Sequence, residues 1–509
     1  MFKKIGHLAV FLLVTTTAFA QSDTLYHEQY RPQIHFSPPA HWMNDPNGLV
    51  YYKGIYHLFY QYYPGATVWG PMHWGHATST DLVHWKNRPI ALYPDSIGLI
   101  FSGSAVVDYH NTSGFGKKGR PPLVAIFTQH NQAREKDGKN DTENQSIAYS
   151  NDGGNTWTKY QHNPVLINPG ISDFRDPKVM WYAPGKKWVM TLATKDRITF
   201  YSSRNLKVWT KESEFGEKLG AHGGVWECPD LFPMTAIDGR KMWVLIVNIN
   251  PGGPQGGSAT QYFTGSFDGK HFKPNNTDTR WIDQGSDEYA GVTFSNTGNR
   301  RIFLGWMSNW QYATVVPTKA WRSAMTIPRE LKLTKVGSDY FISSQPVNEL
   351  AAIKSKTITL PQIRGNGSLT RLIRRRDNQY QLSLSSQNLR SFSLDFSNDK
   401  HERLVAGFDA AKNVWYIDRT EAGDSGFNKD FAKRLEAPRI AKQNNTDVTL
   451  IIDAASMELF ADKGLTVMTA IFFPKKPLNK VGIVVGDVAS PPRFSPDKVT
   501  YTPLKSIWP

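Results

Sequence analysis

A short polar motif that ends in an aromatic residue occurs four times within the first 272 residues of this chain. Each copy begins with Ser, carries Asp or Asn two residues later and closes with Trp or Phe; the copies lie at 79–85, 150–157, 203–209 and 266–272. The Asp or Asn side chain in such a turn can bond nearby backbone groups, and each copy follows a short strand-like run. Repetition every ~50–70 residues is typical of four-stranded β-propeller blades.

The rest of the sequence divides the chain into further segments. We expect a propeller over 21–345, where long helical patterns are absent, and a linker with a short helix at 346–356. Apolar and polar residues then alternate in several short runs, which predicts a second all-β domain, a β-sandwich, over 357–509. The predicted fold class is therefore all-β, with a β-propeller followed by a C-terminal β-sandwich; we expect five blades, one more than the four motif copies.

The first twenty residues are predicted to be a secretory signal peptide. Lys3 and Lys4 precede an apolar stretch at 8–20 that ends in Ala-Phe-Ala, the expected order of a basic region, an apolar region and a small-residue cleavage site. We identify no other membrane-spanning segment, so the mature chain is expected to be periplasmic or extracellular. One cysteine, Cys228, excludes an internal disulfide.

Three acidic residues lie in short motifs rich in proline or aromatic residues, where an unpaired charge is costly. Asp45 lies in WMNDPNG, Asp176 in DFRDP and Glu227 in GGVWECPD. Taken alone, Asp45 fits an ordinary Asp-Pro turn and Asp176 fits a salt bridge with Arg175. Glu227 follows an apolar Trp, which favours the raised pKa that a general acid needs. Two carboxyl groups of this kind could serve as the nucleophile and the general acid in glycoside cleavage.

Five motifs in order make the chain resemble the family 32 glycoside hydrolases, the β-fructofuranosidases that include invertases, inulinases and levanases. The matching stretches lie at 42–48, 101–104, 174–177, 226–230 and 306–310. The resemblance spans essentially the whole mature chain and is strongest to the bacterial levanase and exo-inulinase type. It implies a retaining, exo-acting enzyme that releases terminal fructose from levan, inulin or both, and from sucrose.

The resemblance also implies a role for each carboxyl group. Asp45 would be the nucleophile that attacks the anomeric carbon, and Glu227 the acid and base that protonates the leaving oxygen and then activates water. Asp176 would stabilise the transition state. In a retaining enzyme the two reacting carboxyl groups are expected about 5–5.5 Å apart.

The fructose pocket implied by the resemblance is built from aromatic, amide, hydroxyl and guanidinium side chains, which suit a sugar. The substrate-binding residues expected are Trp42, Met43, Asn44, Gln61, Trp69, Phe101, Ser102, Arg175 and Trp310. Tyr289 is expected at the pocket rim. Cys228 either tunes Glu227 or packs as a small apolar residue.

No cofactor or metal is expected, because two carboxyl groups suffice for this chemistry. His73 and His76 lack a neighbouring acidic ligand, and a strand would direct them to opposite faces. The expected partner is a fructan or sucrose substrate. The net charge of +15 is spread along the chain, which argues against nucleic acid; the oligomeric state is left open.

Several alternatives remain at this point. An endo-acting fructanase or a fructosyltransferase would share the same carboxyl groups, and a fructan-binding protein would share the pocket without turnover. A sialidase is a weaker alternative, suggested only by the turn at 150–157, because sialidases use a tyrosine nucleophile.

Overall fold

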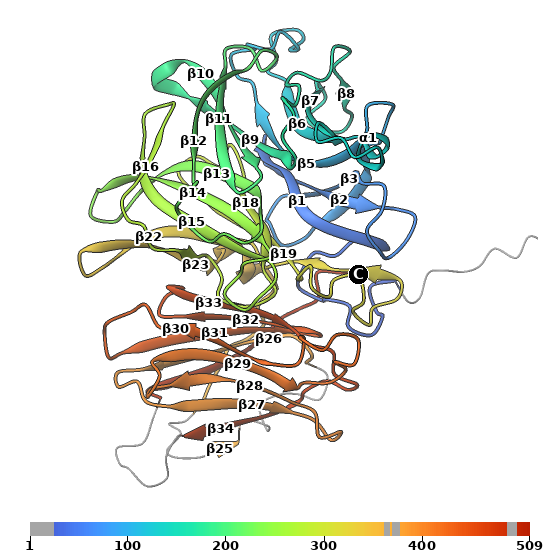
Figure 1. Cartoon of the computed structure of the whole chain (residues 1–509). Helices are drawn as coiled ribbons and strands as arrows, with labels where there is room; N and C mark the ends of the chain where they lie inside the picture. The colour runs from blue at the N-terminus through green and yellow to red at the C-terminus, as the bar shows by residue number, and fades with distance from the viewer. Residues whose placement is uncertain (1–24, 361–366, 369–376, 486–495, 509) are drawn as a thin grey trace, which may run out of the picture.

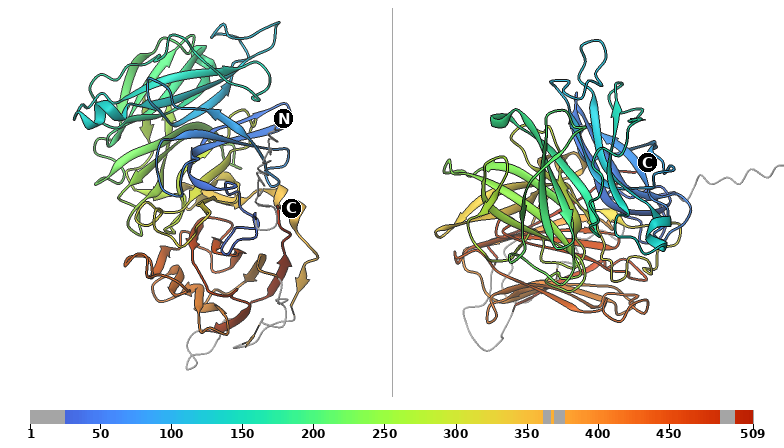
Figure 2. Two further views of the ribbon diagram at one scale, coloured as in Figure 1. Left: turned by 90° about the vertical axis from the view of Figure 1, so that its right-hand side faces the viewer. Right: turned by 45° about the horizontal axis from the view of Figure 1, so that its top comes forward.

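The computed structural model describes residues 25–360, 367–368, 377–485 and 496–508. Figure 1 shows two β-rich parts, one above the other, and Figure 2 shows the same stacking from two further sides. The predicted signal peptide lies outside the described residues. None of the helices in the described ranges is long and apolar enough to cross a bilayer.

The upper part is a propeller of five sheets, whose first strands contact one another around a common axis. The first blade contains β1 (His41–Tyr52), β2 (Ile55–Tyr63), β3 (His73–Ser79), β4 (Lys86–Leu92) and β20 (Trp321–Arg322). The second contains β5 (Leu99–Val107), β6 (Leu123–His130), β7 (Glu143–Ser150) and β8 (Thr158–Lys159). The third contains β9 (Phe174–Tyr182), β10 (Lys187–Thr194), β11 (Arg197–Ser203) and β12 (Thr210–Phe215).

Two further blades complete the ring. The fourth contains β13 (Val225–Thr235), β14 (Lys241–Asn250), β15 (Ala259–Phe267), β16 (Phe272–Pro274) and β17 (Arg280–Trp281). The fifth contains β18 (Tyr289–Thr293), β19 (Ile302–Met307), β21 (Ala324–Met325), β22 (Arg329–Val336) and β23 (Asp339–Pro346). Strand β20 follows the fifth blade's β19 in the chain but pairs in parallel with β1, so a late segment completes the first blade.

The four repeated motifs form the turns that their sequence predicts. Asp81, Asp152, Asn205 and Asp268 each accept hydrogen bonds from backbone N–H groups two to four residues ahead. Each turn joins the third and fourth strands of one of the first four blades. In the fifth blade a two-residue turn with Gly337 at φ +64° joins β22 to β23. No motif copy is needed there, because glycine adopts this conformation freely.

The lower part is a sandwich of two sheets with alternating burial. One sheet orders β24 (Ile358–Thr359), β35 (Lys498–Pro503), β26 (Tyr380–Ser386), β31 (Thr446–Asp453), β32 (Ser456–Ala461) and β33 (Thr466–Ile471). The other orders β25 (Gly367–Ser368), β34 (Lys480–Val485), β27 (Phe392–Ser397), β28 (Arg403–Asp409), β29 (Val414–Glu421) and β30 (Arg434–Pro438). Strands β26 and β27 bury every second side chain, which is the alternation seen in the sequence.

Helical structure is sparse among the described residues. It comprises α1 (Gln132–Lys136) and two 3₁₀ turns, η1 (Ala183–Gly185) and η2 (Asn348–Ile353). The η2 turn lies in the stretch predicted as a linker, and it buries Leu350 and Ile353. The exact domain boundaries stay a prediction.

A buried ionic cluster joins the start of the propeller to the sandwich. Nδ1 of His35 lies 2.7 Å from Oδ2 of Asp453, and Nε2 lies 2.9 Å from Oε1 of Glu458. All three side chains are fully buried. Burial alone would lower the pKa of His35, but its bonds to the two carboxyl groups outweigh burial and raise the pKa to about 9.

This cluster predicts a loss of stability at alkaline pH. A histidine whose pKa is raised on folding stabilises the fold fully below its unfolded pKa of 6.5, and that contribution disappears as the pH rises through about 9. We expect the free energy of unfolding, measured with urea between pH 6 and 10, to fall more steeply for the parent than for His35→Asn. Equal pH slopes for the two proteins would contradict the prediction.

Candidate active site

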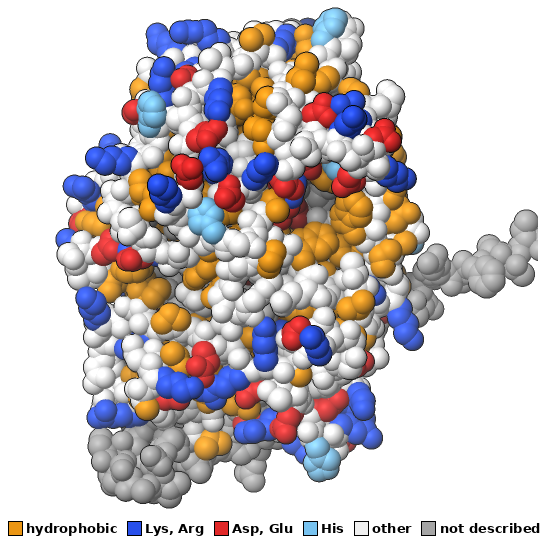
Figure 3. Space-filling view, viewed as in Figure 1, with side chains coloured by type: hydrophobic (Ala, Val, Ile, Leu, Met, Phe, Trp, Pro, Cys, Tyr) orange, Lys and Arg blue, Asp and Glu red, His pale blue; other side chains and the backbone are white. Residues whose placement is uncertain are grey.

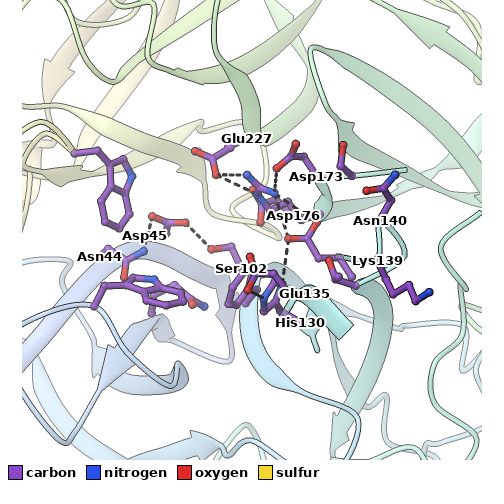
Figure 4. A pocket seen from close by; sticks show the side chains of 18 residues that line it. Asn44, Asp45, Ser102, His130, Glu135, Lys139, Asn140, Asp173, Asp176 and Glu227 are labelled. Carbon is purple, nitrogen blue, oxygen red and sulfur yellow. Dashed lines mark hydrogen bonds and ion pairs between the residues drawn. The ribbon is translucent and has the colours of Figure 1, made fainter. Parts of the chain in front are cut away.

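A pocket of about 380 Å³ opens at one end of the propeller axis. Figure 3 shows a hollow in the upper half of the molecule, with acidic and hydrophobic side chains around it, and Figure 4 shows the pocket from close by. Its lining is mostly polar: Asn44, Asp45, Gln61, Trp69, Phe101, Ser102, His130, Glu135, Lys139, Asn140, Thr142, Glu143, Ser172, Asp173, Arg175, Asp176, Glu227 and Trp310.

The first strand of every blade carries an irregularity in which two residues face one on the neighbouring strand. The pairs are Asn44-Asp45, Phe101-Ser102, Asp176-Pro177, Cys228-Pro229 and Ala290-Gly291. Such bulges redirect side chains and tolerate proline, which cannot donate to the ladder. The residues at 176, 228 and 290 also have φ between +42° and +65°. Asp45 and Asp176 lie in such bulges and Glu227 directly precedes one, and all three line the same pocket.

Asp45 lies half-buried on the floor of the pocket, within a set of donors. Oδ2 accepts a hydrogen bond from the Ser102 hydroxyl at 2.6 Å, and Oδ1 accepts one from the Asn44 amide at 2.9 Å. The Cys228 thiol lies 3.4 Å from Oδ2. These contacts, drawn in part in Figure 4, fix the orientation of the carboxylate before any substrate enters.

Asp176 is buried and lies against the same cysteine. Its Oδ2 accepts a hydrogen bond from the backbone N–H of Cys228 at 2.9 Å. Burial raises the pKa of Asp176 to about 8; the positive charge of Arg175 opposes the shift, and the charges of Glu227 and Asp45 add to it. The ionised form of Asp176 is thus disfavoured in the empty pocket.

Glu227 is held between Arg175 and Tyr289. Its Oε1 accepts hydrogen bonds from Nε and Nη2 of Arg175 at 3.1 and 3.0 Å, and its Oε2 accepts one from the Tyr289 hydroxyl. Burial raises the pKa of Glu227; Arg175 opposes the shift, the charge of Asp45 adds to it, and the Tyr289 bond opposes it. The result is an oriented carboxyl group that retains its proton above the usual pH.

Arg175 links Glu227 to the acidic side of the pocket. Its Nη1 donates to Asp173 at 2.6 Å and to Glu143 at 3.2 Å. Burial alone would raise the pKa of Glu143, but the charges of Arg175 and His130 outweigh it and lower the pKa. The same arginine therefore supports one carboxyl group with a raised pKa and one with a lowered pKa.

Ten of the twelve predicted site residues line the pocket, and two do not. Trp42 and Met43 are fully buried and lie behind the lining, because the bulge in β1 turns the next two residues, not these two, into the pocket. Trp42 donates from Nε1 to the Asn44 side-chain oxygen at 2.7 Å, and the Met43 carbonyl accepts a bond from Trp306. Their placement corrects the expectation of direct substrate contact.

The structure also shows where Tyr289 and Cys228 lie relative to Glu227. Tyr289 lies behind Glu227 and is 1% exposed, so the expectation that it forms the rim is wrong. Cys228 is buried with its sulfur 3.4 Å from Asp45 and 3.6 Å from Asp176. The Cys228 sulfur therefore packs between the carboxyl groups of Asp45 and Asp176.

One wall of the pocket was missed from the sequence. It is formed around α1 and the segment before β9, and its members are His130, Glu135, Lys139, Asn140, Thr142, Glu143, Ser172 and Asp173. The only available signal is the length and charge of the loop between β6 and β7. That signal is weak, since surface loops are commonly polar. The described residues contain no group of three or more potential ligands placed to hold a metal.

Comparison with known proteins places this site in a family. Residues 35–346 match the family model described as Glycosyl hydrolases family 32 N-terminal domain, and residues 349–495 match that of the family's C-terminal domain. Together with the propeller and its pocket, these matches define a glycoside hydrolase. The chain belongs to glycosyl hydrolase family 32, as its five motifs predict.

Individual relatives agree with this assignment. The levanase of Bacillus subtilis (strain 168) is 44% identical over 517 residues, which cover 98% of this chain and 75% of that protein. The crystal structure of the exo-inulinase of Aspergillus awamori matches with a TM-score of 0.86 and 36% identity, over 95% of this chain and all of that one. The structure of the β-fructofuranosidase of Schwanniomyces occidentalis, complexed with fructosyl-erythritol, matches with a TM-score of 0.85 and 33% identity. The match covers 94% of this chain and 99% of that one. The predicted propeller-and-sandwich fold is confirmed.

Proposed function

We propose that this protein is a retaining, exo-acting β-fructosidase that removes terminal fructose from levan, inulin or both, and from sucrose. The observation that carries the proposal is the convergence of Asp45, Asp176 and Glu227 in one pocket, with different environments for each. The names of the similar levanase, exo-inulinase and β-fructofuranosidase support fructose as the sugar.

In the first step Asp45 attacks the anomeric carbon of the terminal fructose. The bond from that carbon to the leaving oxygen breaks as a carbon–oxygen bond to Asp45 forms, and Glu227 gives its proton to the leaving oxygen. Burial raises the pKa of Glu227, which favours the protonated form that this step needs. Ser102 and Asn44 donate hydrogen bonds to the Asp45 carboxyl oxygens and orient them for this attack.

In the second step water replaces Asp45. Glu227, now ionised, takes a proton from water, whose oxygen bonds to the anomeric carbon while the bond to Asp45 breaks. Two displacements restore the original configuration. The same intermediate could pass fructose to a sugar, so products at high substrate concentration distinguish hydrolysis from transfer.

Asp176 suits a role in the transition state. Burial disfavours its charge in the empty pocket, whereas positive charge developing on the fructose ring would favour that charge. Its stabilising interaction would therefore be stronger in the transition state than with bound substrate, which is the condition for raising kcat.

Exo-action is supported by the wall around α1. Lys139 and Asn140 line the same pocket as Asp45 and stand across it from Asp45 in Figure 4. A chain end could enter such a pocket more readily than the middle of a polymer. The leaving group would extend past Glu227 toward this wall.

The proposal is tested by a chromatographic time course on levan, inulin and sucrose. Fructose as the only early product from a polymer would support exo-action, and the faster polymer would define the preference. Early oligosaccharides would instead indicate an endo-acting enzyme. No product from any of the three would contradict the proposed function and favour a fructan-binding protein.

A further inference from the structure

A segment of the propeller just before β18 is bonded along the edge of the sandwich. The backbone N–H groups of Gln284 and Asp287 donate to the carbonyls of Val467 and Thr469, at 2.7 and 3.2 Å. In return, the N–H of Thr469 donates to the Asp283 carboxylate at 2.9 Å. Strand β33 thus fixes residues 283–287 by backbone bonds.

Arg419 of the sandwich adds a side-chain clamp on this segment. Its Nη1 donates to Oδ2 of Asp287 at 2.6 Å, and both side chains are fully buried. Its Nη2 donates to the hydroxyl of Tyr312 at 3.1 Å, and that hydroxyl in turn donates to Oδ1 of Asp287. The guanidinium also lies 3.9 Å from the ring centre of Phe431. Both oxygens of Asp287 are therefore held.

The same segment leads directly to the proposed acid and base. Tyr289 lies two residues after Asp287, begins β18 and donates its hydroxyl to Glu227. Tyr289 is itself packed edge-on against Trp306, with ring centres 6.5 Å apart. A displacement of Asp287 would have a short, buried path to the hydrogen bond on Glu227.

We propose that Arg419 is a positioning residue for the active site: by clamping Asp287 it holds the Tyr289 hydroxyl against Glu227. The inference rests on the proposed function, because Glu227 is taken as the acid. Without Arg419 the buried Asp287 carboxylate loses its only arginine and keeps only hydrogen bonds from Tyr312, Ser286 and the Ile471 N–H. We therefore expect the segment to shift. The sandwich would then act on catalysis without touching the substrate.

The charged and titratable groups around Glu227 and around Asp287 determine how the activity depends on pH. Glu227 is faced by Arg175 and Asp176 from β9, by Asp45 from β1, by Tyr289 from β18 and by its neighbour Cys228. Asp287 interacts with Arg419, Tyr312 and Lys433, and its chain neighbour Glu288 is a buried carboxyl group whose pKa burial raises to about 8. Arg419 has no contact with Glu227 among the described interactions. Its effect on Glu227 would therefore pass through Tyr289.

The test compares Arg419→Met and Tyr289→Phe with a matched control, Arg439→Met. Arg439 forms a two-bond pair with Asp462 at 2.8 Å, which is also buried but lies wholly within the sandwich. The pH dependence of kcat/KM is measured on whichever of levan, inulin and sucrose is cleaved fastest. The pKa of Glu227 is also followed directly by carbon-13 NMR of carboxyl-labelled glutamate, assigned with Glu227→Gln.

Loss of the Tyr289 hydrogen bond should raise the pKa of Glu227, which moves the alkaline limb of kcat/KM up by about one pH unit. Arg419→Met should move it in the same direction, and the double variant should move no further than Tyr289→Phe. Arg439→Met should lower Tm but leave the alkaline limb of the kcat/KM profile at the parent's pH. If Arg419→Met does not fold, Arg419→Lys keeps the charge but not the forked geometry, and a smaller shift is expected.

The inference would be overturned if a folded Arg419 variant kept the parent's alkaline limb of kcat/KM and the parent's pKa of Glu227. Arg419 would then be a purely structural residue. A further shift in the double variant would do the same, since it would show a route other than Tyr289. A parent enzyme inactive on all three sugars would contradict the proposed function alone, because the NMR titration still tests the path.

Discussion

Asp45→Asn should reduce kcat on fructosides by on the order of 10⁴-fold or more, as removal of a nucleophile does. The amide has nearly the shape of the carboxylate but cannot form the covalent intermediate. Its oxygen can still accept a hydrogen bond from Ser102 or Asn44, so the pocket should stay intact. Steady-state kinetics and thermal unfolding measured together separate lost chemistry from lost structure.

Asp173→Asn is the matched control for this variant. Asp173 lines the same pocket and accepts a bond from Arg175, but it lies away from Asp45. We expect it to retain kcat within about tenfold, a change of about 1.4 kcal/mol in the barrier. Parent-like turnover by Asp45→Asn, or an equal loss in both variants, would show that Asp45 is not the nucleophile.

Glu227→Gln should lower kcat on natural fructosides by about 10²- to 10⁴-fold, the usual effect of removing a general acid. Glutamine keeps an oxygen for Arg175, and its amide N–H can donate to the Tyr289 hydroxyl oxygen, so binding should change little. The alkaline limb of the pH profile should also disappear. With a fructoside whose leaving group needs no protonation, azide should replace water in the second step without a base and yield a fructosyl azide of retained configuration.

Glu143→Gln is the control for the acid assignment. Glu143 is buried, lines the pocket and bonds the same arginine, but its lowered pKa leaves no proton to give near neutral pH. Its substitution should leave the alkaline limb present. An azide product of inverted configuration from Glu227→Gln, or loss of the limb in Glu143→Gln instead, would require the roles to be reassigned.

The sequence predicts those parts of this protein that depend on neighbouring residues. The turn at Asp81 and its three counterparts use bonds spanning two to four residues, and they mark four of the five blades. The three carboxyl groups lie in compact motifs that match a known family. Both kinds of signal are local, which is why they can be recognised without the fold.

Other features depend on strand register and on contacts between distant segments. The bulge in β1 decides that Asn44 faces the pocket while Met43 does not, and alternation alone does not place such a bulge. The wall near Lys139 comes from an ordinary polar loop. The bond between Arg419 and Asp287 joins residues 132 positions apart, so neither residue signals the other in the sequence.

The pairing of β20 with β1 has a consequence for how the chain reaches this structure. The first blade is complete only when Trp321 and Arg322 are present, and His35 finds its carboxyl partners only at residues 453 and 458. An emerging N-terminal part would therefore lack native partners until most of the chain had been synthesised. Non-local contacts of this kind slow folding, so the chain would stay unfolded longer than one whose contacts are mostly local.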